Sequence, residues 1–150
     1  MLKEGDQAPD IRLQTETGED FQLSDLKGKR VVLYFYPKAD TPGCTVEACE
    51  FRDDMRKFDK KGVAVIGISP DKSAAQAKFK DKYSLPFPLL ADPDKAAAQA
   101  FGVWKEKNMY GKKVMGIERS TFVIGPEGKI EKIYAKVKAA GHAGEVLAGL

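Results

Sequence analysis

The stretch VVLYFYPKADTPGCTVEACEF, residues 31–51, decides the fold of this 150-residue chain and contains both of its cysteines. Its first part, VVLYFYP, is a run of β-branched and aromatic residues typical of a buried central strand. A helix is predicted from about Pro42 to Lys61, with Gly62 as its stop signal. The apolar residues at helical spacing within it are Ala48, Phe51, Met55 and Phe58. The stretch therefore predicts a strand that leads directly into a helix.

The chain continues to alternate between strand and helix patterns. VAVIGIS, residues 63–69, indicates a second buried strand, and residues 71–85 are predicted to form a helix. FPLLAD, residues 87–92, has the pattern of a short strand, and residues 93–103 that of a further helix. Alternating strands and helices indicate a sheet covered by helices.

An antiparallel hairpin and a final helix complete the pattern. Two alternating runs around Gly125, Pro126 and Gly128 predict a hairpin over residues 120–137. Residues 142–150 predict a short amphipathic helix. We expect one α/β domain over residues 1–150, with a mixed sheet and helices on both faces. A thioredoxin-like fold is one such arrangement, and periodicity alone does not separate it from a flavodoxin-like sheet.

Composition argues against several classes of partner. The net charge is only +3, and runs such as FRDDMRKFDKK interleave both signs, which is typical of a solvated helix face rather than a nucleic-acid groove. No stretch approaches the roughly 18 apolar residues of a membrane span. Because the N-terminus has no export signal, we expect a reducing cytoplasm, where a cysteine pair is more often catalytic or metal-binding than structural.

Local signals nominate Cys44 as a nucleophile. Thr41 is a suitable N-cap and Pro42 suits the first helical position, which places Cys44 in the first turn. Free N–H groups and the positive end of the helix dipole favour an anion there. Because the thiolate is the nucleophilic form of cysteine, this position favours reactivity.

Cys49 follows Cys44 by five residues, a spacing that an intact helix does not bridge. Residues five apart lie roughly 140° around a helix, with Cα atoms about 8–9 Å apart. A disulfide requires less than about 7 Å and converging Cβ vectors. A bond between the two sulfurs therefore requires the first turns to unwind, and Gly43 adds backbone freedom there.

The residues alone leave simpler interpretations open. Free cysteine is a common small buried hydrophobe, so the pair need not be functional. A metal site is poorly supported, because two cysteines and the distant His142 fall short of the usual four ligands. His142 is expected at the surface beside the terminal helix. Residues 107–116, KNMYGKKVMG, are expected to form a basic, solvated loop.

Beyond these local signals, PKADTPGCTVEACEFRD resembles the active-site signature of the peroxiredoxins, with Pro37, Thr41 and Cys44 at the signature spacing. Cys49 resembles the resolving cysteine of one subgroup, the bacterioferritin comigratory protein or peroxiredoxin Q. Later blocks such as AVIGIS, FPLLADPD and GIERSTFVIGPEGKI, which includes Arg119, are similar to that subgroup as well. The resemblance covers essentially the whole chain.

The resemblance implies a thioredoxin-like fold, a mixed central sheet flanked by helices with an N-terminal β-hairpin extension. It implies a thiol peroxidase that reduces hydrogen peroxide and organic hydroperoxides in antioxidant defence. Cys44 would attack the peroxide and become a sulfenic acid. Arg119, Thr41 and the N–H of Gly43 would bind the peroxide, and Pro37 would shield the thiolate.

The resemblance also implies how the enzyme is reset. Cys49 would attack the sulfenic sulfur to give an intramolecular disulfide after local unwinding. Thioredoxin or glutaredoxin would then reduce the disulfide by thiol exchange. No cofactor is required, and a monomer is expected, because the resolving thiol belongs to the same chain.

Bland alternatives remain for several of these residues and for the function. Arg119 without the resemblance would be a surface salt bridge, and Thr41 an ordinary cap. Phe101, Trp104 and Tyr110 favour core packing over a rim for alkyl peroxides. A protein dithiol–disulfide oxidoreductase and a non-enzymatic thioredoxin-like module are the competing functions. Rapid stoichiometric loss of thiols on mixing with peroxide distinguishes the peroxidase from the oxidoreductase, and titration of Cys44 distinguishes it from the non-enzymatic module.

Overall fold

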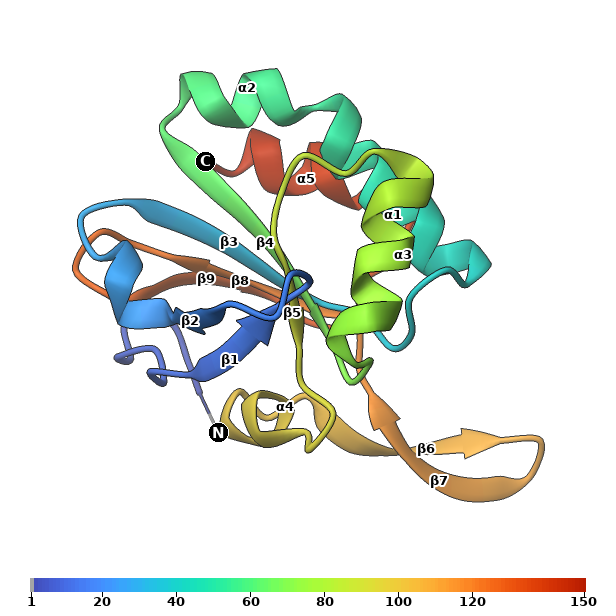
Figure 1. Cartoon of the computed structure of the whole chain (residues 1–150). Coiled ribbons are helices and arrows are strands. Elements are labelled where there is room, and N and C mark those ends of the chain that lie inside the picture. The colour runs from blue at the N-terminus through green and yellow to red at the C-terminus, as the bar shows by residue number, and fades with distance from the viewer. Residues whose placement is uncertain (1) are drawn as a thin grey trace.

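Strand β3 (Arg30–Phe35) is the centre of a seven-stranded mixed sheet in the computed structural model, which describes residues 2–150 (Figure 1). It pairs in parallel with β4 (Val63–Ser69) and antiparallel with β8 (Ser120–Ile124). The strand order is β2-β1-β5-β4-β3-β8-β9. The remaining strands are β1 (Arg12–Thr15), β2 (Asp20–Gln22), β5 (Leu89–Ala91) and β9 (Ile130–Tyr134). The mixed sheet predicted from the alternating pattern is confirmed.

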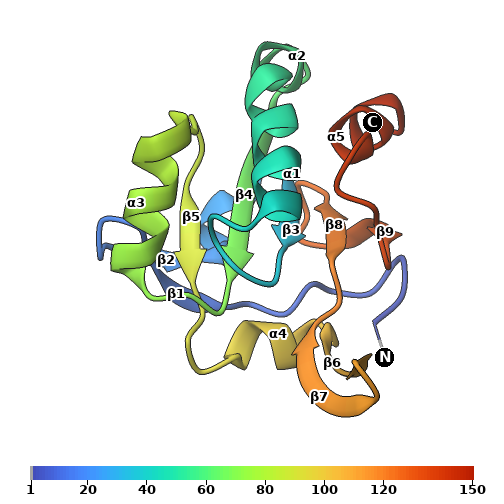
Figure 2. The same ribbon diagram turned by 90° about the vertical axis from the view of Figure 1, so that its right-hand side faces the viewer.

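Four helices cover one face of this sheet, as both views show (Figures 1 and 2). They are α1 (Pro42–Asp53), α2 (Met55–Lys60), α3 (Ser73–Tyr83) and α5 (His142–Ala148). Within residues 2–150, no helix combines the length and the apolar character that crossing a bilayer requires.

The opposite face is covered by α4 (Ala96–Ala100) and the 3₁₀ helix η1 (Leu23–Leu26). β3 supplies both layers, because successive side chains of a strand point to opposite faces. Val31 and Leu33 pack into the core beneath α4, whereas Val32 packs into the core beneath α1. A strand that is apolar at every position is therefore required at this place.

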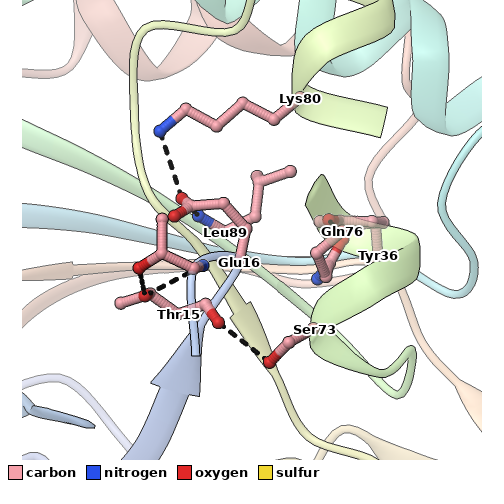
Figure 3. Close-up of polar contacts among 8 residues, drawn as sticks. Thr15, Glu16, Tyr36, Ser73, Gln76, Lys80 and Leu89 are labelled. Carbon is pink, nitrogen blue, oxygen red and sulfur yellow. Dashed lines mark hydrogen bonds and ion pairs between the residues drawn. The ribbon is translucent and has the colours of Figure 1, made fainter. Parts of the chain in front are cut away.

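The N-terminal hairpin β1–β2 belongs to the main sheet, since β1 pairs antiparallel with β5. Polar contacts fasten it to α3 (Figure 3). The Ser73 hydroxyl donates to the carbonyl of Thr15 at 2.9 Å. One Glu16 carboxylate oxygen accepts from Lys80 Nζ and from the backbone N–H of Leu89, both at 3.1 Å. The extension expected from the resemblance thus closes one edge of the sheet.

The helix predicted from Pro42 to Lys61 is interrupted. α1 ends at Asp53, and Asp54 has a non-helical backbone (φ −96°, ψ 3°) before α2 begins at Met55. The apolar spacing continues through the break, so both helices face the same core and the pattern gave no sign of it. α1 is therefore 12 residues long.

Residues 107–116 are not a loop, contrary to the expectation. They belong to a two-stranded hairpin of β6 (Trp104–Met109) and β7 (Lys112–Ile117) that projects from the body (Figure 1). Tyr110 and Gly111 form its turn with φ of 54° and 79°. Positive φ at both central residues is the geometry that matches the twist of paired strands. The sequence did not predict the hairpin, because the segment is rich in lysine and the first residue of its turn, Tyr110, is unusual at such a position.

His142 is also placed differently from the expectation. It is 2% exposed, and its Nε2 lies 2.6 Å from the Thr121 hydroxyl while its Nδ1 lies 3.0 Å from Glu145. Burial lowers the pKa of His142, which favours the neutral ring. The packing of α5 on α1 buries a residue whose neighbours in the chain are polar.

Candidate active site

The loop between β3 and α1 carries two of the predicted site residues. Thr41 has the extended backbone of an N-cap (φ −94°, ψ 158°), as predicted, and Pro42 opens the helix. The Thr41 hydroxyl makes no capping hydrogen bond and instead donates to the carbonyl of Lys38 at 2.8 Å. Pro37 is half-buried earlier in the same loop. Thr41 therefore closes the loop on itself and leaves the N–H groups of the first helical turn without a side-chain partner.

Cys44 lies in the first turn of α1 and is 1% exposed. Arg119, in the link between β7 and β8, donates from Nη2 to Cys44 Sγ at 3.3 Å. The approach depends on Gly43, because a Cβ there would lie 3.3 Å from the same Nη2. The fold thus brings the positive charge of Arg119 into contact with the Cys44 sulfur, although the two residues are far apart in the chain. Arg119 is not the surface salt bridge that its sequence position alone suggested.

Glu47 is a site residue that sequence reasoning missed. Its side chain is fully buried, and Oε1 accepts from Arg119 Nη1 at 2.7 Å. It lies three residues after Cys44, hence on the same helical face, and this spacing was the available signal. Arg119 consequently spans the thiol and the carboxylate with two nitrogens of one guanidinium, which fixes its plane.

Electrostatics couple these groups. Burial raises the pKa of Glu47 to about 7, although the charge of Arg119 acts to lower it. Burial acts to lower the pKa of Arg119, but the charges of Glu47 and Cys44 outweigh it and raise the pKa. Oε2 of Glu47 is buried and has no hydrogen-bond partner among residues 2–150. Arg119 therefore stays charged beside a carboxylate that is only partly ionised at neutral pH.

A polar network connects the loop before α1 to β4 and α3. The Asp71 carboxylate accepts from the backbone N–H of Ala39 and from the Ser69 hydroxyl, both at 2.7 Å. Gln76 Nε2 donates to that hydroxyl at 2.9 Å, and its Oε1 accepts from the Tyr36 hydroxyl at 2.5 Å. Because every link is fixed by another, the chain of bonds positions the loop that leads to α1.

A second contact holds the loop at Asp40, a residue with φ of 60°. Its carboxylate accepts from Lys82 Nζ at 2.9 Å and from the Tyr83 hydroxyl at 2.9 Å. These donors belong to the C-terminal turn of α3 and lower the pKa of Asp40. The end of α3 thus fastens the residue immediately before the N-cap of α1.

Cys49 is half-buried on the intact α1, and both cysteines are free thiols. The structure therefore brings together Cys44, Gly43 and Arg119, keeps Thr41 and Pro37 in the adjoining loop, and leaves Cys49 apart. Within residues 2–150, no three His, Cys, Asp or Glu side chains are grouped so that they could hold a metal ion.

Fold and site together place the chain in the class of cysteine-based thiol peroxidases with a thioredoxin-like fold. Comparison with known proteins identifies the family within that class. The model of the AhpC/TSA family matches residues 4–133, and the chain belongs to this family.

Relatives of one subgroup match the chain along its length. The putative peroxiredoxin bcp of Coxiella burnetii is 52% identical over 149 residues, 99% of each chain. Peroxiredoxin Bcp of Bacillus subtilis is 52% identical over 143 residues, 95% of this chain and 91% of the relative. The resemblance to the bacterioferritin comigratory protein and peroxiredoxin Q subgroup is confirmed.

Solved structures agree on the fold. The bacterioferritin comigratory protein of Xanthomonas campestris superposes with a TM-score of 0.89 at 45% identity, covering 93% of this chain and 88% of that one. A cysteine-to-serine variant of Xylella fastidiosa PrxQ gives 0.94 at 38% identity, covering 99% and 95%. The thioredoxin-like fold is confirmed over the flavodoxin-like alternative, and the chain is a peroxidase, an oxidoreductase.

Proposed function

We propose that this chain reduces hydrogen peroxide and organic hydroperoxides with Cys44 as the nucleophile. The observation that carries the proposal is the Arg119 fork, which contacts both Cys44 Sγ and Glu47. The Cys44 thiolate attacks one peroxide oxygen, the O–O bond breaks, and the other oxygen leaves as water or an alcohol after taking a proton. Sulfur supplies both electrons and becomes a sulfenic acid, so no cofactor is required.

The surrounding groups stabilise the charge that moves during this step. Arg119 faces the sulfur from which negative charge departs, and the N–H groups of Gly43 and Cys44 at the start of α1 face the oxygens that receive it. Glu47 acts as a positioning residue that orients Arg119. The Thr41 hydroxyl orients the peroxide, and Pro37 limits access of water to the sulfur. Organic hydroperoxides are included because the similar Xanthomonas campestris protein has alkyl peroxide reduction activity.

Cys49 then resolves the sulfenic acid of Cys44. Its thiolate attacks the oxidised sulfur, hydroxide leaves and is protonated to water, and a disulfide forms. Because the Cα atoms of residues five apart are about 8–9 Å apart on a helix, α1 must unwind first. Unwinding costs least at a helix end, where few hydrogen bonds are lost.

A dithiol donor of the thioredoxin or glutaredoxin type reduces the disulfide and completes the cycle. We propose that the whole chain, residues 1–150, works as one monomeric domain in a reducing cytoplasm. Both thiols of the cycle belong to this chain, which supports the monomer, and a dithiol donor requires a reducing compartment.

Two cysteine variants test the cycle. Cys44→Ser is expected to abolish peroxide reduction, and turnover of even a few per cent would show that another group is the nucleophile. Cys49→Ser is expected to consume one equivalent of peroxide in rapid mixing and then to stop with thioredoxin as donor. Unchanged thioredoxin-dependent turnover of that variant would mean that an external thiol resolves Cys44.

Arg119→Lys tests the fork, because lysine keeps the charge but cannot contact the sulfur and Glu47 in one plane. We expect the second-order rate constant with hydrogen peroxide to fall by about 10²-fold. Arg56→Lys, on the exposed surface of α2, is the matched control and should leave the rate constant unchanged. A similar rate constant in both variants would remove Arg119 from the mechanism.

A further inference from the structure

The β6–β7 hairpin carries most of the exposed apolar side chains of the protein. Of the five large hydrophobic residues that are exposed within residues 2–150, four belong to it: Met109, Tyr110, Val114 and Met115. Tyr110, at the tip, is 100% exposed. Figure 1 shows the hairpin projecting away from the body. Cross-strand partners share a face of a hairpin, so Met109 and Val114 lie on one face, Met115 lies on the other, and Tyr110 is at the tip. Exposed apolar side chains concentrated on one projecting element favour an interaction surface around its tip.

The same hairpin is strongly basic. It contains one acidic residue, Glu106, and four lysines: Lys105, Lys107, Lys112 and Lys113. Its net positive charge is therefore comparable with the +3 of the whole chain. Steering between opposite charges raises association rates and selects partners. A partner of this surface is expected to be acidic and to offer apolar contacts to the tip of the hairpin.

The hairpin adjoins the active site. β7 ends at Ile117, two residues before Arg119, and Lys105 forms an ion pair of 2.6 Å with Glu118 at the base. The stem of Lys107 lies over Gly116, where a Cβ would come within 3.3 Å of Lys107 Cδ. Burial lowers the pKa of Lys107, and the positive charge of Arg119 acts in the same direction. The base of the hairpin thus lies two residues from Arg119, which contacts Cys44.

We propose that the β6–β7 hairpin is the docking surface for the protein dithiol that re-reduces the Cys44–Cys49 disulfide. This inference rests on the proposed function. A thiolate of the partner attacks one disulfide sulfur, forms a mixed disulfide and releases the other cysteine as a thiolate. The second thiol of the partner then displaces the remaining cysteine. Two electrons pass to the enzyme, whose thiols are restored, and the partner leaves as a disulfide.

A second copy of this chain fits the surface less well. In a two-fold symmetric contact the same patch meets itself, so lysine-rich hairpins would face each other. Like charges across an interface are unfavourable. Redox encounters commonly use small interfaces, which a single projecting hairpin can provide. An acidic, transiently bound reductant satisfies both conditions.

The apolar part of the surface is tested by a triple variant, Met109→Thr, Tyr110→Asn and Met115→Thr. Threonine is favourable in strands. Asparagine before glycine suits the positive φ of the turn, so the hairpin is preserved while three of its four exposed apolar side chains are lost. Circular dichroism and thermal unfolding check that the fold is intact.

The charge is tested by Lys112→Glu with Lys113→Glu. The matched control is Lys60→Glu with Lys61→Glu, which makes the same charge change on exposed residues at the end of α2, far from the hairpin (Figure 1). Both pairs change the net charge equally. A difference in donor kinetics between the two double variants would therefore come from the position of the charges on the hairpin.

Each variant is assayed for peroxide turnover with thioredoxin, its reductase and NADPH, with glutaredoxin and glutathione, and with dithiothreitol. We expect the kcat/KM for the protein donor that supports wild-type turnover to fall about tenfold in both hairpin variants. Turnover with dithiothreitol, and the rapid-mixing reaction of the reduced enzyme with peroxide, should stay within twofold. The charge variant should also show a weaker dependence on salt, and the control should match the wild type.

Three results overturn the proposal. One is a protein-donor kcat/KM within twofold of wild type in both hairpin variants. Another is wild-type turnover with dithiothreitol but with neither protein donor. A third is a wild-type dimer in sedimentation that the hairpin variants dissociate while donor kinetics stay unchanged, which would assign the hairpin to a second copy. Absence of wild-type turnover with dithiothreitol would instead refute the proposed function itself.

Discussion

Glu47→Gln removes the titration of the buried carboxyl beside Arg119 and keeps its shape. The amide oxygen of the substituted side chain can still accept from Arg119 Nη1, whose present bond to Glu47 is 2.7 Å. We compare this change with its parent in a Cys44→Ser background, so that thiol ionisation does not contribute. Any constant cost of burying the amide cancels, because the prediction concerns only how stability changes with pH.

The structure supplies the sign and the size of the effect. Burial raises the pKa of Glu47 from 4.5 to about 7, so the folded protein keeps a proton that the unfolded chain releases. The resulting stabilisation is fully present below the unfolded pKa and is lost as the pH rises through the folded one. One unit of pKa corresponds to about 1.4 kcal/mol, so the parent should lose about 2–3 kcal/mol between pH 5 and pH 8 through this carboxyl.

Urea unfolding at pH 5 and pH 8, followed by the fluorescence of the single tryptophan Trp104, measures this loss. The parent should lose about 2–3 kcal/mol more than the Glu47→Gln variant over this range. Glu127→Gln, in an exposed turn, is the matched control and should retain the loss of the parent. Equal losses with and without Glu47, within about 0.5 kcal/mol, would refute the account of a buried, partly neutral carboxyl.

Three further outcomes follow from the packing. Gly43→Ala should lower the rate constant with peroxide several-fold and cost little stability, because the Cβ of the alanine would displace the Arg119 guanidinium. Stopped-flow kinetics measure the rate constant. Gly67→Ala should destabilise the fold by about 1–3 kcal/mol in urea, since its Cβ would lie 3.0 Å from the Tyr34 ring, and an unchanged midpoint would contradict this packing. Oxidation by one equivalent of peroxide should accelerate amide exchange in residues 42–53, and equal protection in both redox forms would argue against unwinding.

Local patterns in the sequence were sufficient for much of the fold. Residues 31–35 are all hydrophobic and buried, which is typical of a strand buried on both faces, and they belong to β3. Thr41 and Pro42 located the start of α1, because capping preferences depend on neighbouring residues alone. The position of Cys44 in the first turn followed from these local signals.

Other features depended on contacts that no local pattern contains. Residues 107–116 were expected as a loop, because they are rich in lysine and their turn begins with Tyr110, an unusual residue for that position. His142 was expected at the surface because its neighbours in the chain are polar. Its burial comes from the packing of α5 on α1. Tertiary packing overrode the composition in both segments.

The sequence by itself determined that Cys44, and not Cys49, lies in the first turn of a helix, because strand and helix signals act over a few residues. Cys44 is therefore the cysteine that is placed to react. Only the tertiary structure decided what that sulfur meets. Arg119 reaches Cys44 across 75 positions of the chain and Glu47 across 72. Such long-range contacts form because both faces of the sheet must be buried at once, and that requirement is a property of the folded chain as a whole.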